Sequence, residues 1–520
     1  MQTLQFDNQF TQVLPQDPAE DNVRRQIQGA LYSKVEPQKV SAPHLIAYSK
    51  EAASLIGLTP QDCATDAFVQ VFSGNVLLPG MFPHATCYGG HQFGNWAGQL
   101  GDGRAINLGE VPTATGHFML QLKGAGPTPY SRTADGLAVL RSSVREFLCS
   151  EAMYHLGVPT TRALSLIGTG ESVLRDMLYD GNAAMEPGAV VCRMSSSFVR
   201  FGHFQMLTAR GEIELLKQFT DFVIQREFPA IQAAYTDDKD KYVAWFNQVC
   251  QRTADLMVHW MRVGFVHGVM NTDNMSILGE TIDYGPYGWL EDFDPDWTPN
   301  TTDAGQRRYR YGQQPGIGQW NLMQLANAIL PLIEDPKPLE DALSAYATQY
   351  ETRWQEMMAH KLGLSVYDKS LTDNLLSLLT RVETDMTLFF RSLAQVDFTD
   401  AISFTRLHDA YYQPEQITDE VRALTRQWLA QYQHALSEQG VDLNDRPARM
   451  NRCNPKFVLR NYLAQLAIDK AEAGDFALVN KLLDVLRKPY EEQPGHEEFA
   501  AKRPEWARTR VGCSMLSCSS

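Results

Sequence analysis

Basic residues, cysteines and long apolar runs are all scarce in this chain of 520 residues. Its 46 Lys and Arg residues are outnumbered by 61 Asp and Glu residues, and the formal net charge is −15. Because nucleic-acid backbones are bound by basic surfaces, we expect no nucleic-acid partner. No apolar run reaches the roughly 20 residues that a membrane helix needs. The first ten residues also lack the basic start and apolar core of a signal peptide, so we expect no membrane contact.

Cysteine usage points to the cellular compartment. The eight cysteines are scattered without the paired spacing of a structural metal site. This pattern favours a reducing compartment and no disulfide framework, and we expect a cytoplasmic protein. Cys513 and Cys518 are the exception, because they lie close together near the C-terminal end.

The stretch 266–278, followed by Asp283-Tyr284-Gly285, is the most informative part of the chain. Kinase-type active sites place a metal-binding Asn shortly after a His, and then an Asp-x-Gly that completes the metal site. Asn274 and Asp283 fit these two places. An amide oxygen and a carboxylate are the hard oxygen donors that Mg²⁺ prefers. The apolar run from Met275 to Leu278 predicts a short strand between them.

One position departs from the kinase pattern. Protein kinases carry a catalytic Asp five residues before the metal-binding Asn, and here that position is Val269. The nearest carboxylate is Asp273. Either the site is inactive, or Asp273 acts as the base from another direction on a differently placed nucleotide.

Three upstream features fit a nucleotide-binding lobe. The Gly-dense stretch 89–104 ends on Gly101, Gly103 and Arg104, and glycine lets backbone amides approach an anion closely. The pattern of 118–123 predicts a buried strand that ends on Lys123. Helical spacing from Leu140 to Glu151 predicts a helix with Glu146 at its centre, and a strand Lys paired with a helix Glu contacts phosphate in kinases.

Further elements follow from periodicity. We expect strands at 163–167 and 190–193 around a turn at 168–170, and helices at 47–58, 214–228, 241–263, 320–333 and over much of 337–490. Arg193 and Arg200 are candidates to clamp a polyphosphate, since the guanidinium matches phosphate geometry.

These features together predict an α+β, two-lobed, kinase-like fold. The sheet-rich lobe with the nucleotide loops spans 66–204, and the helical lobe with the catalytic and metal loops spans 205–500. An N-terminal extension covers 1–65, and a tail with Cys513 and Cys518 covers 501–520. The acidic and aromatic segment 283–310 is the activation-segment equivalent.

From about Leu78 onward, the ordered motifs resemble the selenoprotein O family, in its bacterial, Cys-containing, YdiU-type branch. The motifs that carry the resemblance are Gly101-Asp102-Gly103-Arg104, Lys123-Gly124-Ala125-Gly126, Thr128-Pro129-Tyr130-Ser131-Arg132, Leu140-Arg141-Ser142-Ser143, 267–274, Asp283-Tyr284-Gly285-Pro286, Asn454-Pro455-Lys456 and Cys518-Ser519-Ser520.

The resemblance implies ATP bound in a reversed orientation and transfer of AMP to Ser, Thr or Tyr hydroxyls of proteins. It implies Asp273 as the base, Asn274 and Asp283 as ligands of Mg²⁺ or Mn²⁺, and an ion pair between Glu146 and Lys123. UTP stays open as an alternative donor. The implied nucleotide contacts are Gly101, Gly103, Arg104, Lys123, Asp135, Gly136, Arg193, Arg200 and Asp283.

Two departures from the family pattern stand out. Leu137 occupies a place where a basic residue is expected. The family's C-terminal Cys is linked to redox control, in some members through a disulfide to the activation segment, but no Cys lies between Asp283 and Arg310 here. Cys518 is left to pair with Cys513 or to stay a free thiol, so we expect any redox control to work differently.

Two other functions stay open. A conventional phosphotransferase would use Asp273 as base, and a pseudokinase scaffold would need no catalysis. Lys123, Glu146, Asn274 and Asp283 argue against a scaffold, and Val269 argues against a conventional kinase.

Overall fold

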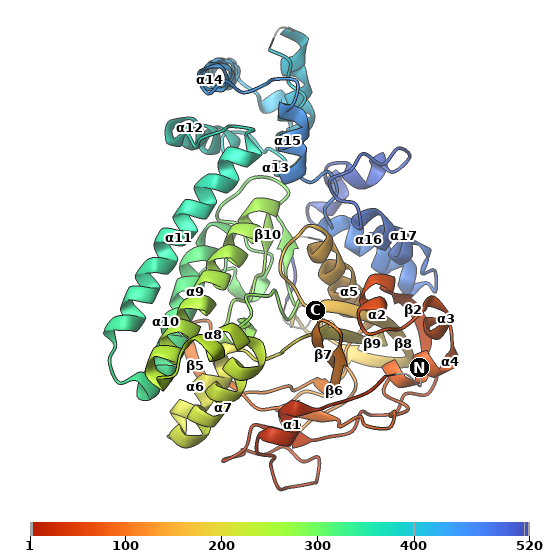
Figure 1. The fold of residues 1–520 in the computed structure, drawn as a ribbon. Coiled ribbons are helices and arrows are strands. Elements are labelled where there is room, and N and C mark those ends of the chain that lie inside the picture. Colours follow the sequence, from red (N-terminus) through yellow and green to blue (C-terminus); the bar gives the residue numbers. More distant parts are fainter. Residues whose placement is uncertain (1–3, 399–400, 514, 518–520) are drawn as a thin grey trace.

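An antiparallel sheet and a large helical region make up the computed structural model, which describes residues 4–398, 401–513 and 515–517 (Figure 1). This architecture confirms the predicted α+β class. The seven strands of the sheet lie in the order β1-β3-β6-β7-β9-β8-β2. Their bounds are β1 (Tyr32–Lys34), β2 (His44–Tyr48), β3 (His84–Thr86), β6 (Ala105–Thr113), β7 (Gly116–Lys123), β8 (Arg162–Arg175) and β9 (Ala184–Ser195).

Two short strand pairs lie outside this sheet. The hairpin of β4 (Gly89–Gln92) and β5 (Asn95–Gln99) is built from the Gly-dense stretch. β10 (Phe265–Val266) pairs with β11 (Gly288–Trp289) and brackets the loop that carries the predicted metal ligands.

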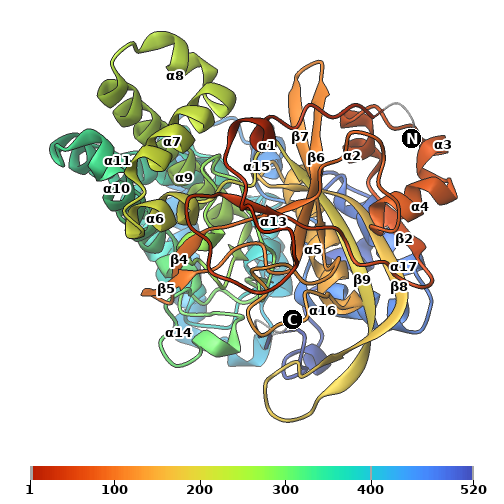
Figure 2. The ribbon, with the colours of Figure 1, turned by 90° about the horizontal axis from the view of Figure 1, so that it is seen from below.

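The long β8–β9 hairpin corrects one prediction. The turn expected at 168–170 is wrong, because β8 continues to Arg175 through a register shift between Gly168 and Ser172. Gly170, with φ of 75°, accommodates this bulge. The chain reverses only after Arg175, and Figure 2 shows the hairpin reaching beyond the rest of the sheet.

Helix α5 (Leu140–His155) packs on β8 and β9 and confirms the helix predicted around Glu146. It ends where Gly157 adopts a left-handed φ of 73°. Two C-terminal helices, α16 (Asn461–Glu472) and α17 (Ala477–Leu486), pack against α5. Their apolar residues join those of α5 and α9 in one core.

The helical region contains the long helices that the periodicity predicts. Asp237 caps α9 (Asp238–Val263) by accepting a hydrogen bond from the Asp240 amide, and Gly264 ends it at φ of 76°. The other helices after β9 are α6 (Phe201–Ala209), α7 (Ile213–Glu227), α8 (Pro229–Ala234), α10 (Gln314–Ile333), α11 (Lys337–Lys361), α12 (Lys369–Leu379), α13 (Met386–Leu393), α14 (Asp419–Glu438) and α15 (Arg446–Cys453).

Short helices complete the chain. Before the sheet's central strands come α1 (Gln9–Val13), α2 (Lys50–Leu55), α3 (Pro60–Cys63) and α4 (Asp66–Phe72). The 3₁₀ turns are η1 (Thr272–Asn274), η2 (Thr301–Asp303), η3 (Tyr311–Gln313), η4 (Ala401–Ala410), η5 (Pro414–Gln416), η6 (Glu497–Ala500) and η7 (Glu505–Ala507).

Two local predictions are corrected. The helix expected over 47–58 is only α2, because Ser49 caps it at the Ala52 amide and the preceding residues pair with β8. The run 275–278 is not a strand. Ser276 forms a single bridge with Arg200, and the chain then turns. The pairing is therefore too short to make a strand.

The described part of the C-terminal tail returns to the segment 283–310, which the sequence predicts to be the activation-segment equivalent. The Leu516 amide donates to the carbonyl of Pro299 over 3.0 Å, and the Thr301 amide donates to the carbonyl of Leu516 over 2.7 Å. Cys513 is buried. Cys518 lies outside the described residues, so both alternatives, pairing with Cys513 and a free thiol, stay predictions. Within the described chain, no helix combines the length and apolarity needed to cross a membrane.

Candidate active site

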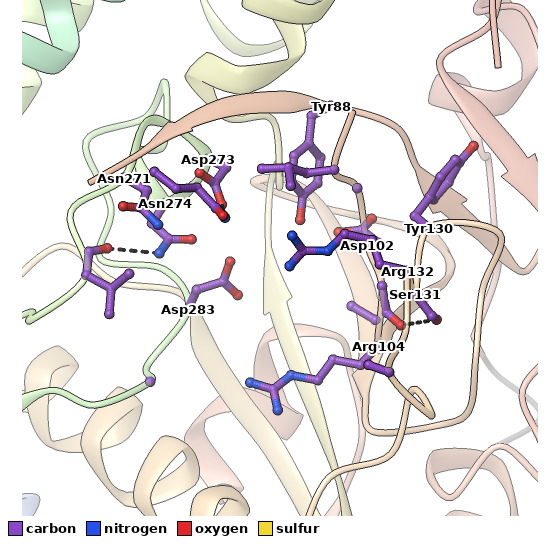
Figure 3. A pocket seen from close by; sticks show the side chains of 18 of the residues that line it. Tyr88, Asp102, Arg104, Tyr130, Ser131, Arg132, Asn271, Asp273, Asn274 and Asp283 are labelled. Atoms are coloured by element: carbon purple, nitrogen blue, oxygen red, sulfur yellow. Dashed lines mark hydrogen bonds between the residues drawn. The ribbon is translucent and has the colours of Figure 1, made fainter. Parts of the chain in front are cut away.

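A cavity of about 450 Å³ lies between the sheet and the loops that follow β10 (Figure 3). This volume is in the range of small-molecule sites. Of the predicted residues, the cavity is lined by Gly101, Gly103, Arg104, Lys123, Arg193, Asp273, Asn274 and Asp283. Asp273, Asn274 and Asp283 lie on one side, and Asp102, Arg104, Ser131 and Arg132 lie on the other (Figure 3).

A buried ion network fixes the cations on the floor of the cavity. Lys123, at the end of β7, contacts Glu146 of α5 through an Nζ–Oε2 distance of 2.5 Å. Arg193, on the neighbouring strand β9, donates to the other oxygen of Glu146 over 2.9 Å and to Gln121 over 2.8 Å. Burial lowers the pKa of Lys123 to about 8, although Glu146 opposes this effect. Lys123 therefore keeps its charge at neutral pH, next to a second fixed cation.

Asp283 is held by two arginines. Arg193 donates to its Oδ1 over 2.6 Å, and Arg200 donates to its Oδ2. These cations outweigh burial and hold the pKa of the Asp283 carboxyl well below its usual value, with Arg200 the strongest of them. The backbone of Asp283 adopts a left-handed φ of 57°, which is costly for a residue with a side chain and is found most often at functional sites.

Arg200 lies beneath the cavity and does not line it. Its side chain is 1% exposed. It donates to the backbone carbonyl of Asp273 over 2.9 Å and lies over the ring of Tyr88, with its Cζ 4.7 Å from the ring centroid. The predicted pair of phosphate-facing arginines is therefore split: Arg193 reaches the cavity, whereas Arg200 joins the Asp273 backbone to the Asp283 carboxylate.

Backbone contacts set the loop between β10 and β11. His267 binds the carbonyl of Ile282 through Nε2 over 2.9 Å and so ties the two ends of the loop together. Asn274 donates from Nδ2 to the carbonyl of Val269 over 2.9 Å. This bond leaves the Asn274 Oδ1 as its acceptor atom.

Asp273 is buried with one oxygen unsatisfied. Its Oδ2 accepts a hydrogen bond from the Gln92 side chain over 3.2 Å, and its Oδ1 has no hydrogen-bond partner among the described residues. Burial raises the pKa of Asp273 to about 6. A Cβ atom on Gly90 would lie 2.5 Å from Oδ1, so only glycine permits this approach of the β4–β5 hairpin.

The β4–β5 hairpin contacts each of the three residues that come directly before Asn274 in the chain. The His91 amide donates to the Thr272 hydroxyl over 2.7 Å, and the Phe93 amide donates to the Asn271 Oδ1 over 3.1 Å. Together with the Gln92–Asp273 bond, these contacts connect three consecutive residues of one loop to one hairpin. The Gly-dense stretch thus has two roles. It lines the cavity, and it holds the loop 271–273 in place beside the cavity.

The opposite wall carries two arginines. Arg104 and Arg132 have no carboxylate partner among the described residues, and Arg104 extends across the cavity toward the Asp283 side (Figure 3). A Cβ on Gly101 would lie 2.7 Å from the Tyr130 side chain, and one on Gly103 would lie 3.0 Å from the Tyr130 carbonyl. Both glycines therefore allow the loop before β6 to pack against 130–132.

Comparison with known proteins identifies the family. A family model described as protein adenylyltransferase SelO matches residues 21–487. The chain belongs to the SelO family. It is 57% identical to a protein of Aromatoleum aromaticum and to one of Azoarcus sp., and 53% identical to one of Flavobacterium johnsoniae, in each case over 100% of both chains. Each of these relatives is named protein nucleotidyltransferase YdiU. Membership makes the chain a nucleotidyltransferase.

Nucleotidyl transfer in the SelO family calls for a divalent metal, and the donors at this site fit one. Asn274 Oδ1 and the ionised Asp283 carboxylate are hard oxygen atoms of the kind that Mg²⁺ and Mn²⁺ prefer. In this SelO-family chain, Arg193 and Arg200 occupy the Asp283 oxygens, each of which keeps a further lone pair.

Asp135 and Gly136 do not line the cavity, although the family resemblance implies nucleotide contacts for both. Arg175, at the end of β8, binds the Asp135 carboxylate over 2.7 Å and the Leu137 carbonyl over 3.0 Å. Gly136, with φ of 75°, packs against the Gly126 backbone. Their roles toward nucleotide remain predictions in this SelO-family chain.

Sequence reasoning missed several residues of the cavity. Gln92 and Asn271 carry no signal beyond their place in the two motif stretches. Arg132 closes the quoted motif at 128–132 and adopts a left-handed φ of 53°. The place of an arginine within a Gly- and Pro-rich loop could have identified it.

Proposed function

We propose that the chain transfers AMP from ATP to Ser, Thr or Tyr hydroxyls of other proteins and releases pyrophosphate. The observation that carries this proposal is the environment of Asp273. One carboxylate oxygen is oriented by Gln92, the other has no hydrogen-bond partner among the described residues, and Asp273 lines the same cavity as Asn274 and Asp283. Val269, at the position of the kinase base, offers no carboxylate.

Asp273 acts as the general base in this proposal. With a pKa of about 6, raised by burial, the carboxylate is mostly ionised at neutral pH yet still accepts a proton in the transition state. The acceptor oxygen attacks the α-phosphorus, its proton passes to Asp273, and the bond from the α-phosphorus to the bridging oxygen breaks. Pyrophosphate leaves with the electron pair of that bond.

The charge distribution of the cavity supports pyrophosphate as the leaving group. Lys123, Arg193, Arg104 and Arg132 all line it, and fixed cations stabilise charge that develops on a leaving phosphate. Mg²⁺ or Mn²⁺, held by Asn274 and Asp283, would supply Lewis-acid stabilisation of the phosphate oxygens when bound. In this arrangement the nucleotide lies reversed relative to protein kinases, with its outer phosphates toward Lys123 and Arg193.

Conventional phosphoryl transfer is the second candidate, because Asp273 could also accept a proton during attack on the γ-phosphorus. A non-catalytic scaffold is disfavoured by the intact Lys123–Glu146 pair and by an Asp283 that is kept ionised. A scaffold has no need of either feature.

Mass spectrometry of an acceptor protein tests the proposal. The chain is incubated with Mg²⁺ or Mn²⁺ and with ATP or UTP in parallel, and fragmentation locates the modified side chain. We expect the acceptor to gain the mass of AMP on a hydroxyl. A gain of one phosphate supports the second candidate, a UMP adduct formed in preference to AMP corrects the donor, and an unmodified acceptor with every donor contradicts transfer.

A further inference from the structure

A second cavity of about 560 Å³ lies where α5, α9 and α11 end and α15 passes. It shares no lining residue with the nucleotide cavity. Its described lining contains Arg262, Arg449, Arg452, His155 and His360, and no Asp or Glu. Such a set is unusual in a chain with a net charge of −15.

The three arginines are not neutralised by carboxylates. Among the described residues, none of them forms an ion pair within 4 Å. The neighbouring cavity gives a contrast, because there Arg391 and Lys456 both pair with Glu492 at 2.7 and 2.5 Å. Among the described residues, the arginines of this cavity therefore lack the carboxylate partner that the cations of the neighbouring cavity have.

Capping of helix ends explains only one of the arginines. Arg262 donates to the carbonyls of Leu156 over 2.7 Å and Cys453 over 3.4 Å, as expected for a cation at helix C-termini. Arg449 makes one long contact, 3.4 Å to the Leu364 carbonyl. Arg452 is exposed and has no hydrogen bond to a described residue. Two guanidinium groups are left for a ligand.

Lys361 adds a positive charge close to the cavity, whereas burial lowers the pKa of His155 and favours its neutral form. Lys361 is buried beside His360, and its Nζ donates to the Arg262 carbonyl over 3.0 Å without any carboxylate partner in the described chain. Burial lowers its pKa to about 8, and Arg262 adds to the lowering. The Nε2 atom of His155 is buried without a hydrogen-bond partner among described residues.

Nearby carboxylates are already occupied. Glu51 and Glu151 lie close to His155. Arg487 contacts Glu51 at 2.9 Å, and Arg162 contacts Glu151 at 2.7 Å. These pairs keep the two carboxylates from cancelling the cavity's charge.

We propose that this cavity binds a small anion that carries phosphate groups, held by Arg449 and Arg452 with Arg262 behind them. Planar guanidinium groups bind phosphate oxygens in pairs, and the volume suits a pyrophosphate or a small phosphate ester. Tyr490 supplies an aromatic wall. This site is independent of the function proposed for the first cavity.

Cys453 provides a local reporter of occupancy. It lines the cavity and is the one half-buried cysteine among the seven described, since the other six are buried. Its alkylation by neutral iodoacetamide is followed by peptide mass spectrometry with and without metal-free pyrophosphate. This readout is blind to pyrophosphate bound in the nucleotide cavity. We expect labelling to slow about tenfold at ten times the dissociation constant, and to be unchanged by sodium chloride at equal ionic strength.

The variant Arg449→Ala/Arg452→Ala should lose this protection. The control Arg422→Ala/Arg426→Ala removes the same charge from exposed positions on α14 and should keep it. Each variant is compared with itself without pyrophosphate, and its melting temperature is recorded. If the double variant does not fold, Arg452→Ala alone gives the same comparison.

Three results would overturn the proposal. They are unslowed labelling of the wild type, equal slowing in the Arg449→Ala/Arg452→Ala variant, and equal slowing by salt alone. Citrate that protects as well as pyrophosphate would make carboxylate, and not phosphate, the recognised group, and would therefore overturn the proposed ligand class.

Discussion

The side-chain amide of Gln92 donates a hydrogen bond to Asp273 Oδ2 over 3.2 Å, across 181 positions of the sequence. Two backbone amides of the same β4–β5 hairpin, those of His91 and Phe93, donate to the side chains of Thr272 and Asn271, so the hairpin holds all of 271–273. The proposed base is thus oriented by a hairpin that precedes the sheet's central strands in the sequence but packs against α6 of the helical region (Figure 2). Any movement of the hairpin would change the direction of the carboxylate.

Replacing Gln92 with Ala should lower the turnover number and leave the KM for ATP nearly unchanged. The hydrogen bond orients the base and is not expected to carry nucleotide affinity. Loss of one hydrogen bond to a charged group corresponds to a decrease of about 10- to 100-fold. Steady-state kinetics of AMP incorporation measure both constants. Asn95→Ala, in the turn of the same hairpin, is the control, and a Gln92 variant with normal turnover would refute the positioning role.

The substitution Glu146→Gln should weaken nucleotide binding and destabilise the fold. Glu146 holds both Lys123 and Arg193, and loss of its charge leaves two buried cations next to each other. Breaking a buried ion pair costs about 3–5 kcal/mol. We expect a higher Kd for ATP in calorimetry and a lower melting temperature, whereas Glu351→Gln on the exposed face of α11 should change neither. Unchanged affinity would exclude the Lys123 network from nucleotide binding.

AMP transfer should depend on a divalent metal that is bound by Asp283. Chelation by EDTA should abolish AMP transfer, and Mg²⁺ or Mn²⁺ should restore it, because the proposed ligands are hard oxygens. Asp283→Ala should be inactive with either metal. Asp283→Asn keeps the shape of the side chain and lacks its charge, so it separates folding from metal binding. Full activity of Asp283→Ala at a normal melting temperature would remove Asp283 from the metal site.

Acid should destabilise the sheet side of the molecule through His84. This side chain is buried against Phe10 and Tyr32, and burial lowers its pKa to about 4. Between that value and the unfolded value near 6.5, the unfolded chain binds more protons than the folded one. The contribution of His84 to stability therefore rises with pH across this window and is lost as pH falls, by about 1.4 kcal/mol per pH unit and about 3 kcal/mol in total.

The variant His84→Phe removes this titration and should lower the slope of unfolding free energy against pH by about 1.4 kcal/mol per pH unit between about 4 and 6.5. The slope that remains comes from other buried histidines, such as His203 and His259. Denaturant unfolding at a series of pH values measures the slope. His434→Gln, on an exposed residue of α14, should leave the slope as in the wild type. A His84→Phe slope equal to that of the wild type would show that His84 titrates normally in the folded state.

The sequence predicted the features that depend on local pattern. Helix α9, helix α5 and strand β7 follow from periodicity and caps, and the motifs around Lys123, Asn274 and Asp283 meet in one cavity. Partners chosen by long-range packing were out of reach. Arg200 binds Asp283 from below, and Arg175 binds Asp135, because a β-bulge extends β8 to that position. No local sequence pattern predicts either of these two ion pairs.

The most direct test of AMP transfer uses two preparations of ATP, labelled with radioactive phosphorus at the α or at the γ position. Each is incubated with the chain, Mg²⁺ and an acceptor protein, and protein-bound label is counted after removal of free nucleotide. We expect only the α label to become bound, and Asp273→Asn to lose it. Protein-bound γ label without α label would show that the chain transfers the terminal phosphate and not AMP.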